Sequence, residues 1–113
     1  MSNQKPQMAL ADHSKTYPVK SKDVTWKVLD GETVLLNLDT GVYFTLNATG
    51  TAVWELYNGR TSLAEITKVL CEQFDVTSEQ ARRDLMELTQ RLLDEGLVKI
   101  ADDTTTTQGA HRA

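Results

Sequence analysis

The sequence has few of the residues from which catalytic and metal centres are built. Its 113 residues include one cysteine, Cys71, and two histidines, His13 and His111. A single cysteine excludes an internal disulfide, and these three residues do not give the ligand spacing of a zinc site. No run approaches the roughly 20 consecutive apolar residues of a membrane helix, and residues 1–20 lack the apolar centre of a secretory signal. We therefore expect a cytoplasmic protein with no cofactor and no membrane partner.

The chain also lacks an excess of positive charge. Its formal net charge is -4, and residues 23–100 hold seven Lys or Arg against thirteen Asp or Glu. Because nucleic-acid affinity comes largely from cations that neutralise phosphates, this balance argues against a DNA or RNA partner. A winged-helix nucleic-acid-binding protein remains the alternative, with residues 1–22 or a locally basic face as its contact surface.

The composition divides the chain into three parts. Residues 1–22 are polar with two prolines, and residues 101–113 are a threonine run followed by small and polar residues. Both segments have too little apolar surface to offset the entropy lost on ordering. We expect a disordered basic N-terminal arm at 1–22, a disordered tail at 101–113, and one domain over residues 23–100.

The central block begins with three stretches in which apolar and polar residues alternate, at residues 24–28, 34–38 and 42–46. A period of two is typical of a strand with one buried face. Asp30-Gly31 and Asp39-Thr40-Gly41 separate the stretches, and such short turns join antiparallel neighbours. The pattern predicts a three-stranded antiparallel sheet whose third strand is a possible edge for a partner strand.

Three helices are predicted after the sheet. Asn47, Ser62 and Thr77 are each placed to cap a helix, and the last two are followed three residues later by Glu or Gln, the capping-box pattern. The predicted helices span about residues 47–57, 62–74 and 78–95. Since a sheet of this size cannot stand alone, the helices are expected to cover its apolar face, which gives an α+β fold.

The last predicted helix carries apolar residues beyond its core stripe. The stripe consists of Ala81, Leu85, Leu88 and Leu92. One flank adds Arg82, Met86, Thr89 and Leu93. Met86 and Leu93 indicate either wider burial of this helix or a groove for a partner. On the third strand, Tyr43 is either a solvent-facing ring or a contact for a bound chain. The residue pattern leaves both questions open.

The sequence offers no catalytic set. Cys71 has no neighbouring His or basic residue to lower its pKa, Glu65 is explained by helix capping, and the block 23–100 has no histidine to act as a base. Its glycines do not have the spacing of a phosphate-binding loop. We therefore expect a protein that is not an enzyme.

Two runs of the central block carry specific motifs. They are VLLNLDTGVYFTLNATGTAVWELYNGRTSLAEI and FDVTSEQARRDLMELTQRLLDEGLV. In the first, Gly-x-Tyr-Phe is joined to Leu-Asn-x-x-Gly and Val-Trp. Through these motifs residues 24–100 resemble the PqqD-like family of peptide-binding domains, and more closely its wider relatives than the PqqD of quinone-cofactor synthesis. The resemblance implies a winged helix-turn-helix-like fold, with the same order of elements as the periodicity predicts.

The resemblance also implies a function. Such domains recognise the leader segment of ribosomally made precursor peptides that are later modified. This chain would then be a non-catalytic chaperone that binds a leader by strand addition and presents it to a modifying enzyme, by the resemblance a radical-SAM protein, in PQQ or related biosynthesis. The resemblance places the peptide on the third strand and third helix, at Val42, Tyr43, Phe44, Thr45, Leu46, Arg82, Arg83, Met86, Thr89 and Leu93. Arg82 and Arg83 are expected to pair with acidic leader residues.

Overall fold

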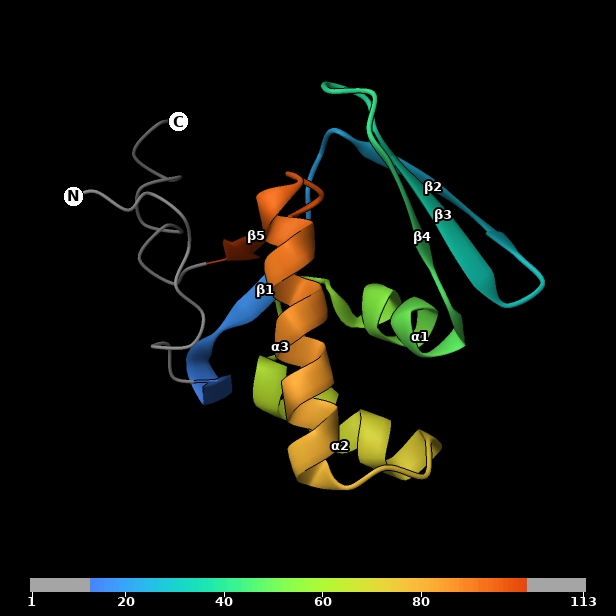
Figure 1. Cartoon of the computed structure of the whole chain (residues 1–113). Helices are drawn as coiled ribbons and strands as arrows, with labels where there is room; N and C mark the ends of the chain where they lie inside the picture. The colour runs from blue at the N-terminus through green and yellow to red at the C-terminus, as the bar shows by residue number, and fades with distance from the viewer. Residues whose placement is uncertain (1–12, 102–113) are drawn as a thin grey trace.

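A computed structural model describes residues 13–101 as a sheet with helices packed on one of its faces (Figure 1). The strands are β1 (Tyr17–Lys20), β2 (Val24–Leu29), β3 (Glu32–Asn37), β4 (Tyr43–Leu46) and β5 (Val98–Ala101), and the helices are α1 (Ala48–Leu56), α2 (Leu63–Gln73) and α3 (Ser78–Asp94). Strands β2, β3 and β4 form an antiparallel sheet in that order. The predicted α+β fold is confirmed, and β4 is an edge strand as expected.

Local signals in the sequence explain most of these elements. Asp30 and Gly31 both have positive φ, 54° and 81°, which is the two-residue turn that matches the twist of an antiparallel hairpin. The side chains of Asn47, Ser62 and Thr77 each accept a hydrogen bond from a backbone N–H at the start of their helices. The Ser62 N–H also donates to the Glu65 carboxylate, which completes a capping box. The predicted caps are therefore confirmed.

Strands β1 and β5 correct the predicted arm and tail. They pair antiparallel from Tyr17↔Ala101 to Lys20↔Val98 and form a separate two-stranded sheet. The prediction of a disordered arm is wrong for residues 17–20, because a strand partner from the other end of the chain supplies the order that local composition does not indicate. Ala101 likewise belongs to β5. Residues 1–12 and 102–113 lie outside the described residues, so the rest of both predictions stays a prediction.

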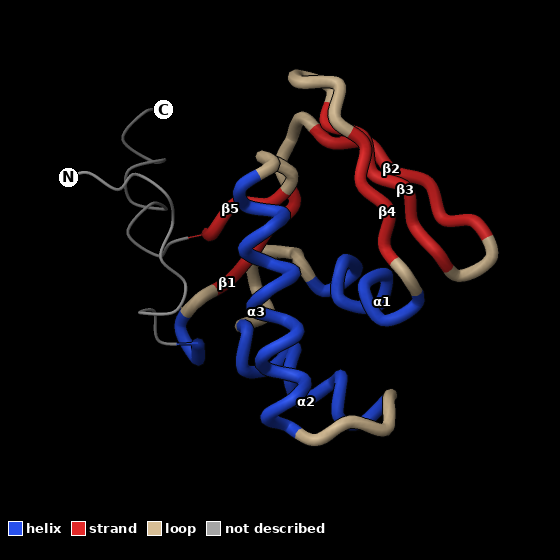
Figure 2. The backbone as a smooth tube through the Cα atoms, viewed as in Figure 1, coloured by secondary structure: helices blue, strands red, loops and turns tan. Residues whose placement is uncertain are grey.

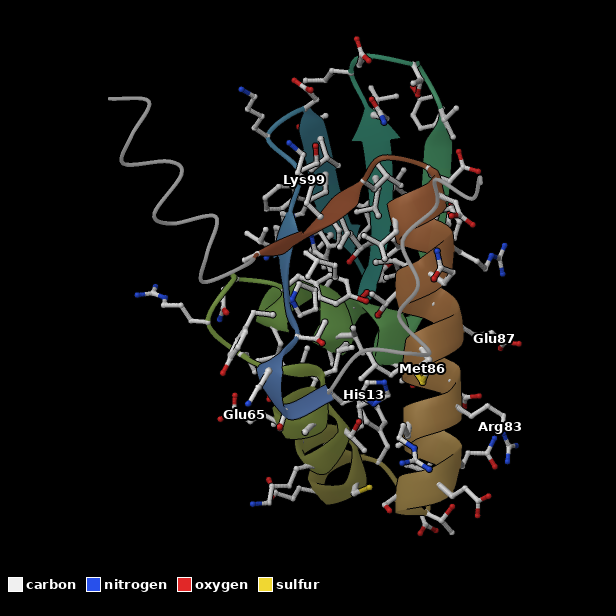
Figure 3. The ribbon with its side chains drawn as sticks, turned by 90° about the vertical axis from the view of Figure 1, so that its left-hand side faces the viewer. His13, Glu65, Arg83, Met86, Glu87 and Lys99 are labelled. Carbon is white, nitrogen blue, oxygen red and sulfur yellow. The ribbon has the colours of Figure 1, made fainter. Side chains whose placement is uncertain are left out.

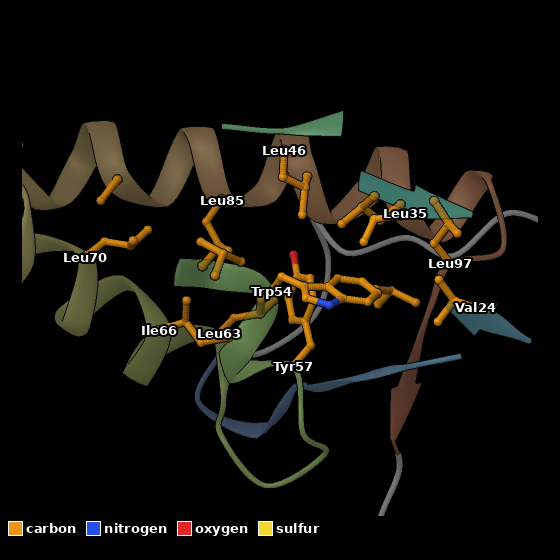
Figure 4. Close-up of a cluster of buried hydrophobic side chains, with 14 residues drawn as sticks. Val24, Leu35, Leu46, Trp54, Tyr57, Leu63, Ile66, Leu70, Leu85 and Leu97 are labelled. Carbon is orange, nitrogen blue, oxygen red and sulfur yellow. The ribbon is translucent and has the colours of Figure 1, made fainter. Parts of the chain in front are cut away.

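The core lies between the sheet and the three helices and is centred on α1 (Figure 4). Trp54 is fully buried, and its ring contacts those of Trp26 and Tyr57 edge to face, at centroid distances of 5.4 and 5.9 Å. Burial of such large rings contributes more than most core positions to stability. Since the Trp54 ring contacts both Trp26 of the sheet and Tyr57 at the end of α1, α1 is the central helix of the fold.

Helix α3 lies between two groups of strands. Figure 2 shows β4 on one side of it and the β1–β5 pair on the other, and the first part of α3 packs against α2. The two sides of α3 therefore face different parts of the molecule.

In the described residues no helix is both long and apolar enough to cross a bilayer.

The side chain of Asn37 fixes the β3–β4 turn to the end of α3. Its Nδ2 donates to the Glu95 carbonyl oxygen at 2.8 Å, and its Oδ1 accepts from the N–H groups of Asp39 and Thr40 at 2.8 and 3.2 Å. Asn37 is 3% exposed, so water has little access to take the place of a hydrogen bond that this side chain loses. One buried amide thus holds β4 beside the last turn of α3.

We predict that Asn37→Asp lowers the free energy of unfolding by about 1–3 kcal/mol, because the carboxylate keeps both turn bonds but cannot donate to the Glu95 carbonyl. Asn37→Ala, which loses all three bonds, is expected to be less stable than Asn37→Asp. Urea unfolding followed by tryptophan fluorescence measures both. Equal stability of Asn37→Asp and the natural chain would show that the tie to α3 contributes nothing.

Candidate functional site

The free edge of β4 presents unpaired backbone groups. The Asn37 N–H donates to the Val42 carbonyl at 2.9 Å, which is one step beyond the Leu36↔Tyr43 pair in the register. Hydrogen-bonded and non-hydrogen-bonded pairs alternate along an antiparallel ladder. The N–H and C=O groups of Tyr43 and Thr45 therefore point away from β3, toward the open edge.

The side chains of β4 divide between the two faces of the sheet. Leu46 is buried and Phe44 is half-buried on the face that meets the helices. Tyr43 is 68% exposed and lies with Thr45 on the opposite face. The pleat turns Tyr43 away from the helices, as the sequence predicts, and contact of the Tyr43 and Thr45 side chains with a bound chain stays a prediction.

A hollow of about 390 Å³ lies between β4 and the three helices. Its apolar lining comes from Phe44, Leu46, Val53, Leu70, Val76, Leu85 and Leu88. Its charged lining comes from Asp84 and Arg91, both on α3. The hollow combines a free strand edge with apolar side chains beneath it, which is the arrangement that strand addition of a peptide needs.

The flank of α3 that meets this hollow is not the predicted one. Asp84, Leu88 and Arg91 line it, whereas Arg82, Met86 and Leu93 lie on the other side of the helix. Met86 and Leu93 are half-buried and pack against the core, and Figure 3 shows Met86 and His13 on the side of the β1–β5 pair. The wider-burial interpretation of Met86 and Leu93 fits these contacts.

The two predicted arginines lie on the surface away from the hollow. Arg82 lines a second depression, of about 350 Å³, with His13 and Glu79. Arg83 is exposed, and its Nη2 lies 3.8 Å from the Glu79 carboxylate. The structure therefore brings neither arginine next to β4.

Thr89 corrects the predicted helix pattern. It is fully buried, and its hydroxyl lies 2.5 Å from the Tyr57 hydroxyl. Burial raises the pKa of Tyr57, and the Thr89 hydrogen bond opposes this shift. Thr89 is therefore part of the core, where it satisfies the polar end of Tyr57. Leu88, which the sequence places in the core stripe, packs against the core and also lines the hollow.

Sequence reasoning missed Asp84, Leu88 and Arg91 as site residues. The charge of Asp84 and Arg91 placed them on a solvated flank, and Leu88 fitted a helical stripe without further explanation. A signal was present in Tyr57, because a buried phenol requires a polar partner, and Thr89 is an uncharged polar residue of α3 one position from that stripe. Placing Thr89 inward would have rotated the predicted helix and moved Leu88 toward β4.

Arg91 closes one end of the hollow. Its guanidinium carbon lies 5.3 Å from the centroid of the Phe44 ring, a cation–π distance. At the other edge of the sheet, the Lys20 ammonium lies over the Trp26 ring of β2. Of the two edges, the β4 edge borders the hollow, and Arg91 lies beside it.

Comparison with known proteins agrees with this geometry. The family model described as coenzyme PQQ synthesis protein D (PqqD) matches residues 32–98. The structure of TbiB1 in complex with the TbiA(beta) leader peptide is 32% identical to this chain, with a TM-score of 0.67, and the match covers 72% of this chain and 94% of TbiB1.

A second solved structure, lasso peptide synthetase B1 complexed with the leader peptide, is 23% identical with a TM-score of 0.66. The match covers 74% of this chain and 98% of that one, and at this identity it shows the fold alone. No curated protein matches the chain. None of these matches favours a nucleic-acid-binding protein.

We predict that Thr89→Val lowers the free energy of unfolding by about 1–3 kcal/mol, since it leaves the Tyr57 hydroxyl buried without a partner. Adding Tyr57→Phe removes that hydroxyl and is expected to recover part of the loss. Urea unfolding of both single variants and of the double variant measures the coupling. Additive losses would mean that the two hydroxyls do not depend on each other.

Proposed function

The chain belongs to the PqqD family, as its sequence motifs predicted, and from this premise we propose that it binds the leader segment of a precursor peptide along β4. The observation that carries the proposal is the unpaired edge of β4 beside an apolar hollow. An extended peptide adds to such an edge through its main chain, while alternate side chains enter the hollow. TbiB1, which is 32% identical, is solved with a leader peptide.

The backbone and the side chains have different tasks in this proposal. Tyr43 and Thr45 each offer an N–H and a C=O to the incoming strand, contacts that do not depend on the peptide sequence. Phe44, Val76 and Leu88, which line the hollow and are not fully buried, offer apolar surface to peptide side chains that point toward α3. Ordering an extended peptide costs entropy, so both contributions are needed for binding.

We further propose that the protein is a carrier and not an enzyme. It presents its bound peptide in the cytoplasm to an enzyme that modifies the peptide. Within residues 13–101 no three His, Cys, Asp or Glu side chains converge in a way suited to a metal ion. The family resemblance suggests a radical-SAM partner in PQQ or a related biosynthesis, and this identity stays a prediction.

We predict that Thr45→Pro weakens peptide binding about tenfold or more, because proline removes one outward N–H and places its ring against the incoming strand. The Thr45 N–H does not bond to β3, so an edge proline is compatible with the sheet. Thr45→Ala, the matched control, keeps the N–H and is expected to bind like the natural chain.

The probe for this measurement is a random library of displayed 12-residue peptides, selected on the full chain. Selected peptides are then labelled with fluorescein and titrated against each variant by fluorescence polarisation. Backbone NMR is expected to show shifts at Tyr43 and Thr45 on binding. Selection of the same peptides with equal affinity by Thr45→Pro, whose fold is checked by circular dichroism, would overturn the proposal.

A second prediction separates the two flanks of α3. Leu88→Gln is expected to weaken binding of the selected peptides about tenfold, because it replaces apolar surface in the hollow. Met86→Gln makes the same kind of change on the opposite flank and is expected to leave affinity unchanged. If Met86→Gln weakens binding and Leu88→Gln does not, the peptide lies against the flank first predicted from the sequence.

A further inference from the structure

We propose that the hollow selects peptides by the order of their charges, with a basic side chain before an acidic one. This inference rests on the proposed function and adds the chemical class of the segment that binds. It comes from two side chains of opposite charge, Asp84 and Arg91, which line the same hollow two helical turns apart.

Arg91 is available to an acidic side chain of the peptide. Its guanidinium lies over Phe44, the β4 residue whose side chain points toward the helices. In residues 13–101 the ion pair within 4 Å is Arg83–Glu79, so Arg91 has no carboxylate partner there. A peptide residue opposite Phe44 shares its face of the sheet and so points toward Arg91.

Asp84 is available to a basic side chain at the other end. Its Oδ2 accepts a hydrogen bond from Gln80 Nε2 at 3.4 Å, a long contact between neutral amide and carboxylate. Helix α3 and β4 run in opposite directions in Figure 1, so Asp84, which precedes Arg91, lies toward the Leu46 end of the strand. The two charges thus mark the two ends of the peptide path.

The spacing of the charges sets the spacing of the peptide residues. Seven helical residues correspond to about 10 Å along α3. In a strand, side chains on one face recur about every 7 Å. Peptide residues two or four positions apart on the inner face therefore reach Asp84 and Arg91.

The direction of the peptide then fixes the order of its charges. Antiparallel pairing is slightly more stable per residue than parallel pairing, so the peptide is taken to run opposite to β4. It passes the Leu46 end first and the Phe44 end second. Its basic residue therefore comes two or four positions before its acidic residue.

The experiment repeats the random 12-residue selection on the full chain and on the double variant Asp84→Arg with Arg91→Glu. The natural chain is expected to enrich peptides with basic before acidic residues at these spacings, and the double variant the reverse order. Each set is expected to bind its own protein about tenfold more tightly than the other. The matched control, Glu79→Arg with Arg82→Glu, exchanges charges on the opposite flank and is expected to keep the natural order.

The outcomes separate this inference from the proposed function. Peptides that bind at β4 by NMR but show no charge order, or the same order in the double variant, overturn the inference and leave the proposed function intact. Acidic before basic residues in the natural chain overturn the assigned direction and with it the inference. If no peptide is enriched over the Thr45→Pro variant, the proposed function itself fails.

Discussion

One buried amide determines whether the edge of β4 can act as a site. Asn37 holds the β3–β4 turn with its oxygen, and its nitrogen donates to the carbonyl oxygen of Glu95, the residue that follows α3, so the turn is tied to the end of the helix. A peptide strand needs about 4.8 Å beside β4 and must still reach the helix with its side chains. If α3 moved inward it would fill the hollow, and if it moved outward Leu88 and Arg91 would no longer border the hollow beside β4.

The rotation of α3 is fixed by a second polar contact in the core. Tyr57 comes from α1, and its buried hydroxyl requires a partner, which Thr89 supplies. Once Thr89 points inward, Leu88 is turned toward β4, and the flank with Arg82 and Met86 toward the β1–β5 side. A helix with a purely apolar stripe could rotate by a fraction of a turn with little loss, whereas a hydroxyl pair permits one rotation.

Most of the fold follows from signals that lie close together in the sequence. Strand alternation, the Asp30-Gly31 turn and the caps at Ser62 and Thr77 each depend on a few neighbouring residues, and each was predicted. Strand β1 was missed because its partner, β5, lies at the other end of the described chain, where no local pattern points to it. For the same reason the sequence predicted the β4 edge but not which side chains of α3 line the hollow beside it. The β4 edge is a local property, but the flank of α3 that meets it depends on the contact between Tyr57 and Thr89.

Because β4 is short, its edge suits the proposed carrier, which binds a peptide and releases it again. Only Tyr43 and Thr45 direct backbone groups outward from this strand, and each net main-chain hydrogen bond is worth about 0.5–1.5 kcal/mol. The backbone alone therefore gives weak binding to any extended chain, and the side chains that enter the hollow must supply the rest. Since those contacts lie along one open side of α3, a peptide can leave without the domain unfolding. Affinity that depends on a few side chains, on an edge that stays open to solvent, would let the proposed carrier distinguish its peptide and still release it.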